Sequence, residues 1–393
     1  MILINADLHI HSKYSISTSK QMVFKTLASE APAKGVHLIG TGDCLHEKWL
    51  KEIKSLEKVD EGTYKCLDTQ FILSTEVQAH KRIHHLILFP SISSVEEFRE
   101  NIKSHSKNLN SDGRPHVALT GEELGQLSID VGAIFGPCHA FTPWTGLYGY
   151  FNNLHECYGD CSKAVSFLEL GLSADSNYAD RLAELKNITF LSNSDAHSPY
   201  PLRLAREFNQ FKVNEISFSE IKKAILRKSG RKCILNVGIP PEEGKYNRSA
   251  CIKCFKKYSL EQSIKNDWKC SCGGRIKKGV SDRINELANF SEPRHPKHRP
   301  EYIHIIPLAE IIAKAMNYKN PNCASVKKLW DALIADFENE INILLNVKYK
   351  HIERATNGKL AKAIEYFREN RIILYPGGGG RYGHIELPNS TLF

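Results

Sequence analysis

The sequence lacks the features that mark membrane proteins and disordered chains. No uncharged run approaches the roughly 20 apolar residues that a transmembrane helix needs, and no long low-complexity stretch occurs. The N-terminal Met-Ile-Leu-Ile-Asn-Ala-Asp has neither a basic leader nor a small-residue cleavage site. With 393 residues, 41% of them hydrophobic, we expect two or three folded domains in a cytoplasmic protein with no membrane partner.

Cysteine is concentrated in one short window. The chain has 11 cysteines, of which four lie between positions 251 and 272 while the others are scattered. This distribution differs from the framework of small disulfide-rich secreted proteins, and it favours reduced thiols plus one metal site. We therefore expect no structural disulfide.

Acidic residues are scarce in one part of the chain. The formal net charge is +9, and the excess of lysine and arginine lies mainly between Ile239 and Arg299, where it includes Lys277, Lys278 and Arg283. Clustered basic charge attracts polyanions because neutralised phosphates release their counterions. A nucleic acid is therefore one candidate partner, and a solvated lysine-rich surface is the alternative.

Apolar runs alternate with amphipathic stretches through the first 240 residues. The strand candidates are Ile2–His9, Val36–Thr41, Phe71–Glu76, His85–Phe89, Gly132–Cys138, Phe167–Leu170 and Ile188–Ser192. Helical patterns such as Val23–Lys34 and Val95–Ser106 separate several of them. The alternation predicts a mostly parallel sheet with crossover helices, and the number of strands favours a barrel.

Polar residues recur where these strands end. The residues are His9, Asp43, Glu76, His139, Glu169 and Asp195. They stand at or just past the C-terminal ends of their strands, which form the rim where barrel enzymes build active sites. Imidazoles suit Zn, Mn or Fe, and bridging carboxylates neutralise more than one ion. We therefore predict a cluster of divalent metals at one mouth of the barrel.

Spacing supports some ligands and leaves others open. His9-x-His11 and Asp195-x-His197 each aim two side chains at one side, because side chains alternate along a strand. His84 and His85 compete for one role, and we select His85 because it directly precedes an apolar strand. Glu169 is either a ligand or a hydrogen-bonding residue at the rim. Ordinary loop or surface positions are expected for the histidines without nearby partners, which are His37, His80, His105, His116 and His155.

The four clustered cysteines form a specific motif. Cys251-x-x-Cys254 is followed after 15 residues by Cys270-x-Cys272-Gly-Gly. Two such pairs of thiolates suit a tetrahedral structural zinc, and reactive thiols are the alternative. A short lysine-rich segment buries little core, so metal binding should supply much of its folding free energy.

The sequence pattern becomes helical beyond Gly279. The helical stretches are Asp282–Phe290, Leu308–Asn317, Ser325–Asn346 and Asn357–Glu369. They precede four consecutive glycines in Tyr375-Pro-Gly-Gly-Gly-Gly-Arg-Tyr-Gly383. The glycines form either a simple hairpin turn or a backbone that approaches a phosphate, with Arg381 and Tyr382 alongside. The spacing does not match a nucleotide-binding loop, so we expect no nucleotide cofactor.

The order of the polar residues resembles a known superfamily. His9-x-His11, Asp43, Glu76, His85, His139 and Asp195-x-His197 are similar to the motifs of the polymerase-and-histidinol-phosphatase (PHP) superfamily. The resemblance implies an α/β fold with a distorted seven-stranded, TIM-like barrel that holds two or three metals. One departure is that the usual Thr-Asp-His is here Gly42-Asp43-Cys44, and His46 is the candidate to replace the missing ring.

The same resemblance implies roles within the cluster. We expect Glu76 to bridge two ions and to act in catalysis together with Asp195 and His139. The expected ligands are His9, His11 and Asp195 for the first ion, His85 and His139 for the second, and Asp43, His46 and His197 for any third. The ions are expected to be zinc, manganese or magnesium, with iron as a further candidate, and one structural zinc is expected at the four cysteines.

Longer segments resemble one family within that superfamily, endonuclease Q. The segments are Gly40–His46, Gly136–Trp144, Gly171–Ser176, Cys270–Val280 and Tyr375–Gly383. The resemblance covers essentially the whole chain. It implies a DNA repair endonuclease that cuts on the 5′ side of deaminated bases (uracil, hypoxanthine, xanthine) and abasic sites. A sliding clamp is a further candidate partner.

Such an enzyme must inspect a base that is stacked inside duplex DNA. Flipping the base out costs a few kcal/mol, and aromatic side chains can restack it in a pocket. Trp144 and Tyr148 are the candidates to line this pocket, and packing beside the barrel is the alternative for Trp144. The other expected DNA contacts are Lys277, Lys278, Arg283, Arg381 and Tyr382.

Three domains and three functional classes follow. We expect a PHP-type nuclease domain at 1–240, a four-cysteine zinc-binding domain at 241–282 and a C-terminal helical DNA-binding domain at 283–393. A phosphatase for small phosphomonoesters would explain the barrel but not the basic C-terminal third. A non-catalytic DNA-binding module would explain the charge but not the ligand set. A lesion-directed endonuclease accounts for all three parts.

Overall fold

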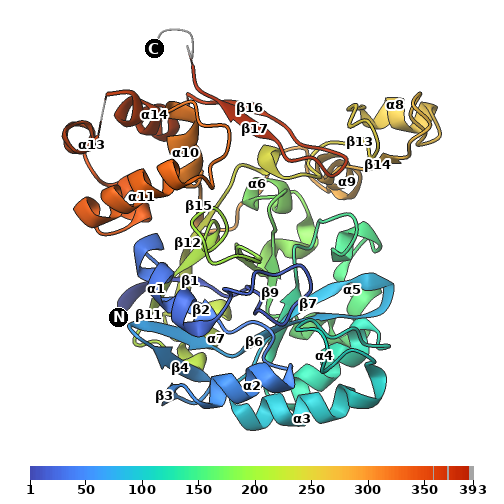
Figure 1. Cartoon of the computed structure of the whole chain (residues 1–393). Helices are drawn as coiled ribbons and strands as arrows, with labels where there is room; N and C mark the ends of the chain where they lie inside the picture. Colours follow the sequence, from blue (N-terminus) through green and yellow to red (C-terminus); the bar gives the residue numbers. More distant parts are fainter. Residues whose placement is uncertain (357, 370, 389–393) are drawn as a thin grey trace.

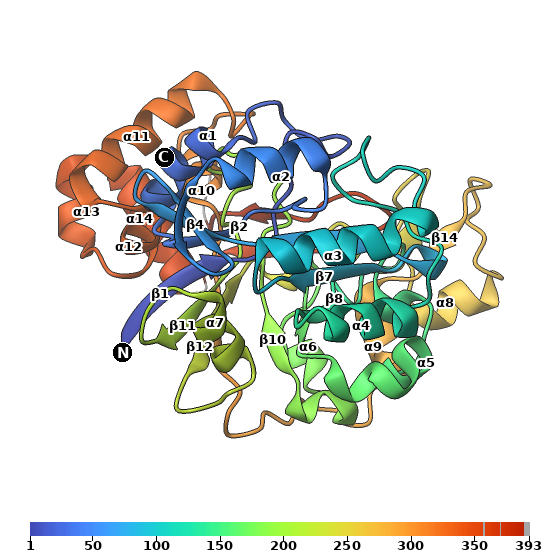
Figure 2. The same cartoon turned by 90° about the horizontal axis from the view of Figure 1, so that it is seen from below.

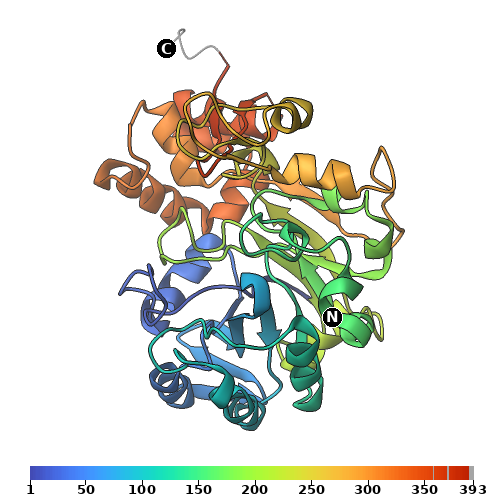
Figure 3. The ribbon, with the colours of Figure 1, turned by 90° about the vertical axis from the view of Figure 1, so that its right-hand side faces the viewer.

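The computed structural model describes residues 1–356, 358–369 and 371–388 of the chain. An α/β body is formed by the first 240 or so residues, and a small four-cysteine module and a group of C-terminal helices lie together at one end of it (Figures 1 and 3). A hairpin of β16 (Ile373–Tyr375) and β17 (His384–Glu386) reaches from the C-terminal helices toward the four-cysteine module. No helix in the described part of the chain has the length and apolar character that crossing a bilayer requires.

The largest sheet of the body has eight strands in the order β15-β12-β11-β1-β2-β5-β4-β3. Its strands are β1 (Ile2–Asp7), β2 (Leu38–Gly40), β3 (Glu57–Asp60), β4 (Thr63–Cys66), β5 (Thr69–Ile72), β11 (Phe208–Val213), β12 (Lys232–Gly238) and β15 (Glu301–His304). β1 pairs in parallel with β2 but antiparallel with β11. The sheet is therefore mixed, whereas the sequence pattern had indicated mostly parallel strands.

Two smaller sheets complete the body. β6 (Ser74–Gln78), β7 (His84–Leu88) and β8 (Ile134–Pro137) are antiparallel neighbours, and β9 (Phe167–Glu169) pairs in parallel with β10 (Thr189–Leu191). The predicted strand 71–76 is divided between β5 and β6 at Leu73, whose N–H turns to the carbonyl of Gly62. Among the described residues no sheet closes on itself, so the α/β class is confirmed and the seven-stranded barrel is not.

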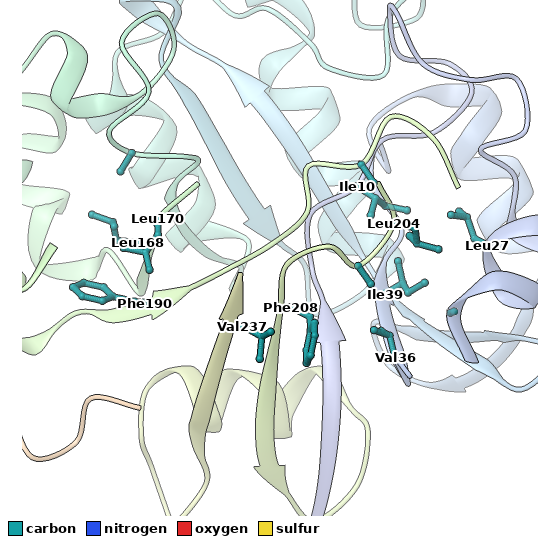
Figure 4. Close-up of a cluster of buried hydrophobic side chains, with 14 of the residues drawn as sticks. Ile10, Leu27, Val36, Ile39, Leu168, Leu170, Phe190, Leu204, Phe208 and Val237 are labelled. Atoms are coloured by element: carbon teal, nitrogen blue, oxygen red, sulfur yellow. The ribbon is translucent and has the colours of Figure 1, made fainter. Parts of the chain in front are cut away.

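Short helices cover the body. They are α1 (Phe24–Lys34), α2 (Glu47–Lys54), α3 (Ile92–Ile102), α4 (Gly121–Asp130), α5 (Leu154–Tyr158), α6 (Ser176–Ala179) and α7 (Phe218–Ile225). α2, α3 and α4 lie along the outside of the body near β6 and β7 (Figures 1 and 2). The interior is apolar, and Figure 4 shows Phe208 and Val237 of two neighbouring strands lying between Phe190 on one side and Ile39 on the other. A continuous core of this kind fixes the strand ends that carry the site.

The remaining elements form the two smaller parts. The four-cysteine module contains β13 (Ala250–Cys251), α8 (Leu260–Lys265) and β14 (Ile276–Lys277), and α9 (Val280–Leu287) follows it. The C-terminal helices are α10 (Leu308–Ala315), α11 (Ala324–Phe337), α12 (Glu340–Leu345), α13 (Tyr349–Ala355) and α14 (Gly358–Arg368). The predicted helix 325–346 is two helices, because Glu338 takes a φ of 72° and Asn339 caps α12.

Candidate active site

Two groups of candidate metal ligands lie side by side in the body. The ligand atoms of His9, His11 and Asp195 lie within 4.8 Å of one another, and so do those of Glu76, His84 and His139. Oε1 of Glu76 lies 2.7 Å from Nδ1 of His84, and its Oε2 lies 3.4 Å from Nε2 of His11. Glu76 therefore joins the two groups, as a carboxylate shared by two divalent cations must.

The backbone explains how residues far apart in sequence meet. Ile10, just beyond β1, pairs in parallel with Ala196, and the N–H of His11 donates to the carbonyl of Ala196 at 3.0 Å. The pairing places His9 and His11 beside Asp195. Asp195 and His139 have φ angles of 48° and 30°, a left-handed conformation that is uncommon for non-glycine residues and concentrates at functional sites.

Neighbouring carboxylates orient the two histidines that follow β1. Nδ1 of His9 lies 3.0 Å from Oε1 of Glu169, and Nδ1 of His11 lies 3.1 Å from Oδ1 of Asp43. The opposite nitrogens, Nε2 of His9 and Nε2 of His11, are buried, and no described residue forms a hydrogen bond with either. A carboxylate behind the ring and an unsatisfied nitrogen in front of it are characteristic of metal-binding histidines. Glu169 and Asp43 thus lie behind the rings, where they orient these ligands.

The electrostatics of the site favour bound positive charge. Burial alone would lower the pKa of His9, but Glu169, Glu76 and Asp195 outweigh burial and raise that pKa to about 9. Burial would raise the pKa of Glu76, yet the nearby His84 and Arg114 hold that pKa well below its ordinary value. Glu76 thus stays ionised and requires a nearby cation, which either protonated histidines or metal ions supply. Together with the unsatisfied nitrogens, this donor set fits divalent metals.

The structure corrects the choice between His84 and His85. In the β6–β7 pairing Glu76 lies opposite Leu86, so the side chains of Glu76 and His84 share one face of the hairpin. His85 points to the other face, where its Nδ1 lies 2.8 Å from the hydroxyl of Tyr158. Burial there lowers the pKa of His85 to about 3. His84, not His85, is therefore brought to the ligand groups.

The residues expected at a third ion are not gathered into one group. His197 lies near the cluster, with its ring centroid 4.4 Å from that of His11. Its Nδ1 is buried and has no hydrogen-bond partner in the part of the chain that the structure describes. His46 stacks on Tyr14 at 4.4 Å instead, and among the described residues it belongs to neither ligand group. Cys138 does belong to such a group, together with His9 and Glu76, although sequence reasoning missed it. Its place directly before His139 was the available signal.

The ligand groups open into a cavity of about 590 Å³. Trp144 and Tyr382, both predicted to contact DNA, line it. Four cationic residues that the sequence did not single out line it as well: Arg114, Arg203, Arg206 and Lys245. Arg203 and Arg206 share one loop, whereas Arg114 and Lys245 come from two others, so no sequence spacing identifies the set. Nη1 of Arg114 donates to Oε2 of Glu76 at 2.8 Å, which connects the cationic lining with the ligand groups.

Other predicted DNA contacts are engaged within the protein. Tyr148 is fully buried, donates its hydroxyl to Glu184 at 2.7 Å and stacks on Phe141, so it cannot face a base. Arg283 donates to the carbonyls of Tyr148 and Phe151 at 2.8 and 3.0 Å and so holds this loop against α9. Lys278 forms an ion pair with Glu286, whereas the ammonium of Lys277 lies 3.7 Å from the ring centroid of Trp144.

The glycine-rich turn packs against protein backbone. The N–H of Gly377 donates to the carbonyl of Glu242 at 2.8 Å, and the N–H of Gly383 donates to that of Glu243 at 3.0 Å. A Cβ on Gly377 would lie 2.5 Å from the carbonyl oxygen of Gly244, a distance that no side chain tolerates. The close approach therefore joins the β16–β17 hairpin to segment 242–251. Arg381 is exposed at this turn.

The four cysteines converge as their spacing predicts. Their sulfur atoms lie within 4.8 Å of one another, and Cys251 is 3.5 Å from Cys272. The backbone at Cys272 and the Tyr258 hydroxyl donate toward Cys270 and lower its pKa to about 6, despite partial opposition from burial. A thiolate at neutral pH among three other thiols fits a tetrahedral zinc.

Comparison with other sequences places the chain among uncharacterised relatives. Residues 307–371 match the family described as the MJ0043 C-terminal domain. The uncharacterised protein MJ0043 of Methanocaldococcus jannaschii is 45% identical over 261 residues, which are 65% of this chain and 32% of that protein. The chain thus spans about a third of the length of that relative. The uncharacterised protein YqxK of Bacillus subtilis is 31% identical, and the match covers 98% of this chain and 99% of YqxK.

Two solved structures resemble the chain over nearly their full length. The lesion-specific endonuclease PfuEndoQ from Pyrococcus furiosus is 47% identical with a TM-score of 0.92, and the match covers 100% of this chain and 97% of PfuEndoQ. Endonuclease Q in complex with a 27-mer duplex bearing an abasic lesion at the active site is 46% identical with a TM-score of 0.95, covering 100% and 98%. The chain therefore belongs to the endonuclease Q family.

Proposed function

We propose that this chain is a metal-dependent endonuclease that hydrolyses the DNA phosphodiester on the 5′ side of deaminated bases (uracil, hypoxanthine, xanthine) and abasic sites. The observation that carries the proposal is the pair of ligand groups joined by Glu76 at the base of a cavity lined by cations and aromatics. A relative that was solved with an abasic lesion at its active site supports the choice of substrate.

The joined ligand groups would hold two divalent ions. His9, His11 and Asp195 are the proposed ligands of one ion, and His84 and His139 those of the other, with Glu76 between them. Bound there, the ions would supply a water of lowered pKa and stabilise charge on the leaving oxygen. The imidazole-rich donor set favours zinc, manganese or iron over magnesium, which prefers oxygen ligands.

The remaining residues of the site would orient the metal ligands and neutralise the charge of a bound phosphate. Glu169 and Asp43 fix the rings of His9 and His11 with their Nε2 atoms toward the cavity. Arg114 is bonded to Glu76 and lines the cavity, so its guanidinium is in reach of a phosphate held beside the ions. Hydrolysis of a phosphodiester requires stabilisation of the negative charge that develops on the phosphate. Arg114 and the ions held around Glu76 would supply it.

Lesion recognition is proposed for the aromatic part of the cavity. Trp144 lines the cavity and carries the ammonium of Lys277 over its ring at 3.7 Å. A flipped base could stack on such a ring. We further propose that residues 1–240 supply the chemistry, while the four-cysteine module (241–282) and the C-terminal part (283–393) bind the duplex. Docking on a sliding clamp stays a prediction.

Replacing the bridging carboxylate tests the function. Glu76→Ala should abolish nicking of a labelled duplex with one uracil or abasic site in the presence of Mn, Zn or Mg, because both ligand groups lose their shared anion. Binding of the same duplex should stay measurable, since the cationic lining is intact.

Glu61→Ala, on an exposed surface, is the control and should cut normally. Undiminished cutting by Glu76→Ala would refute the assignment. A chromogenic phosphomonoester run in parallel tests the second candidate function, because turnover of that compound without nicking would favour a small-molecule phosphatase.

A further inference from the structure

One side of the catalytic cavity carries cations that the metal ligands do not use. Arg203, Arg206 and Lys245 line the cavity together with Asp195. Arg206 is 7% exposed, and its guanidinium donates to the carbonyl of Ser194 at 3.1 and 3.2 Å. In the described part of the chain, none of the three cations has a carboxylate within ion-pair distance. Their charge therefore remains available to an anion.

The acids nearest to these cations do not cancel their charge. Burial raises the pKa of Glu207 to about 8, against the opposing effect of Arg206. Burial and the neighbouring Glu310 raise the pKa of Glu243 well above its ordinary value. With a pKa of about 8, Glu207 is mostly protonated at neutral pH and does not cancel the charge of Arg206.

A tyrosine from the other end of the sequence completes the cluster. The ring of Tyr382 lies 5.6 Å from the guanidinium carbon of Arg203 and 5.6 Å from the ammonium of Lys245. Burial opposes ionisation of its hydroxyl, but Arg206, Lys245 and Arg203 outweigh burial and lower its pKa. A hydroxyl whose pKa is lowered by three nearby cations can share an oxyanion with them.

The glycine-rich turn places the side chain of Tyr382 at the cluster. The N–H of Gly380 donates to the carbonyl of Lys245 at 3.0 Å, and Gly383, directly after Tyr382, is bonded to Glu243. A Cβ on Gly383 would lie 2.4 Å from the carbonyl oxygen of Glu242. Two chain segments thus lock together with Lys245 on one and Tyr382 on the other. Glycine is therefore required at this turn because only a residue without a side chain allows the close backbone contact that places Tyr382 beside Lys245.

We propose that Arg203, Arg206, Lys245 and Tyr382 bind the DNA phosphate adjacent to the one that is cut. The inference rests on the proposed function. Arg206 donates a hydrogen bond to the carbonyl of Ser194, the residue directly before the candidate ligand Asp195. The cation cluster is therefore adjacent to the metal site. One DNA strand carries a phosphate for roughly every 3.4 Å of helix axis, so a strand held at the metals presents its next phosphate close by. Phosphate contacts of this kind fix the register of the strand, here relative to the cutting site.

Single neutral linkages test the site. Duplexes with one lesion receive one methylphosphonate at each position in turn on the damaged strand. For the wild-type protein, the linkage next to the scissile one should lower kcat/KM by about tenfold, the scale of one lost charged contact. Lys245→Gln should lower kcat/KM on the all-phosphate duplex to a similar extent and should lose its sensitivity at that position alone.

Lys51→Gln on an exposed face of α2 is the control and should keep the wild-type pattern. A Lys245→Gln protein that remains sensitive at every position would overturn the proposal. Tyr382→Phe keeps the ring and removes the hydroxyl, so it should weaken the response at the same position. A Tyr382→Phe response identical to wild type would also count against the site.

Binding measurements separate this proposal from the function on which it rests. In the Glu76→Ala background, the slope of log affinity against log salt should fall by about one on adding Lys245→Gln. An unchanged slope would refute the phosphate contact even if lesions are cut. Conversely, absence of cutting by the wild-type protein would refute the nuclease assignment while the slope still tests the anion site.

Discussion

At the scale of single residues, the adjacent His84 and His85 are expected to have different roles, metal binding for His84 and stabilisation of the fold for His85. His84→Ala should reduce bound metal by at least one ion per chain and lower the nicking rate by about 100-fold or more, because a ligand of the Glu76 group is lost. His85→Ala should retain the metals, since its ring faces Tyr158 on the opposite side of β7. Metal content by mass spectrometry and single-turnover nicking measure both effects.

His85→Ala also provides the internal control, because it removes the same chemical group from the same strand. Its expected defect is in stability, where a lost buried hydrogen bond and a cavity act together. Loss of metal by His85→Ala with retention by His84→Ala would reverse the assignment that the strand register supports.

The pH dependence of metal binding follows from the charged surroundings of His9. Without metal its pKa is raised to about 9, so at neutral pH the ring holds a proton that an incoming ion must displace. Metal affinity should therefore rise as pH increases from 7 toward 9 and fall as pH decreases. Titration of metal into chelator-stripped protein at several pH values checks this, and an affinity that is flat over that range would contradict it.

The candidate site shows which residues a sequence can reveal. His9, His11 and Asp195 stand just past apolar runs, and their order matches the motifs of the PHP resemblance, so the strand pattern and the resemblance together selected them. Arg206 and Lys245 lie in loops whose paths depend on tertiary contacts, and no local pattern identifies them. The choice between His84 and His85 likewise depends on how β7 pairs with β6, which the sequence alone does not reveal.

At the scale of elements, buried polar residues explain the strands that were missed. β11 and β12 contain Asn209 and Asn236, both fully buried, and the side-chain amide of Asn236 donates to Oδ1 of Asn209 at 2.9 Å. Asparagine interrupts an apolar run and is uncommon in strands, so neither segment reads as a strand in isolation. The hydrogen bond from the Asn236 amide to Asn209 can form only once the two strands have paired.

The four-cysteine module and the glycine-rich turn are expected to act as one element. Gly378 and Gly379 lie against the backbone of Arg248 and Cys251, so the fold of the module supports the β16–β17 hairpin. Cys254→Ser should abolish metal binding at the four-cysteine site, speed amide exchange in the hairpin by about tenfold or more, and lower kcat/KM through misplacement of Tyr382. Hydrogen exchange over residues 373–386 measures this directly.

Cys66→Ser, at a partly buried thiol outside the four-cysteine site, is the matched control and should leave hairpin exchange unchanged. Slow exchange in a metal-free Cys254→Ser protein would show that the hairpin is held by the body and the C-terminal helices instead.

At the scale of the whole molecule, a buried ion pair joins the body to the C-terminal helices. The ammonium of Lys34 lies 2.6 Å from Oε1 of Glu340 and donates to the carbonyl of Pro201 at 2.7 Å. Nε1 of Trp330 donates to the other oxygen of Glu340 at 2.6 Å. Lys34 and Glu340 are each 1% exposed. The pair therefore connects α1, the loop that carries Arg203 and the first turn of α12.

Removing one partner of this pair should be far more harmful than removing both. Glu340→Ala leaves the ammonium of Lys34 buried without its counter-charge, which should cost about 3–5 kcal/mol of unfolding free energy. Lys34→Met combined with Glu340→Leu removes both charges with similar volume and should recover most of that loss. Urea unfolding of the three proteins measures the difference. If the double variant is as unstable as Glu340→Ala, the pair stabilises the interface through its hydrogen bonds to Trp330 and Pro201. If it recovers stability but cuts DNA more slowly, the pair serves to place the Pro201 loop, and with it Arg203, at the cavity.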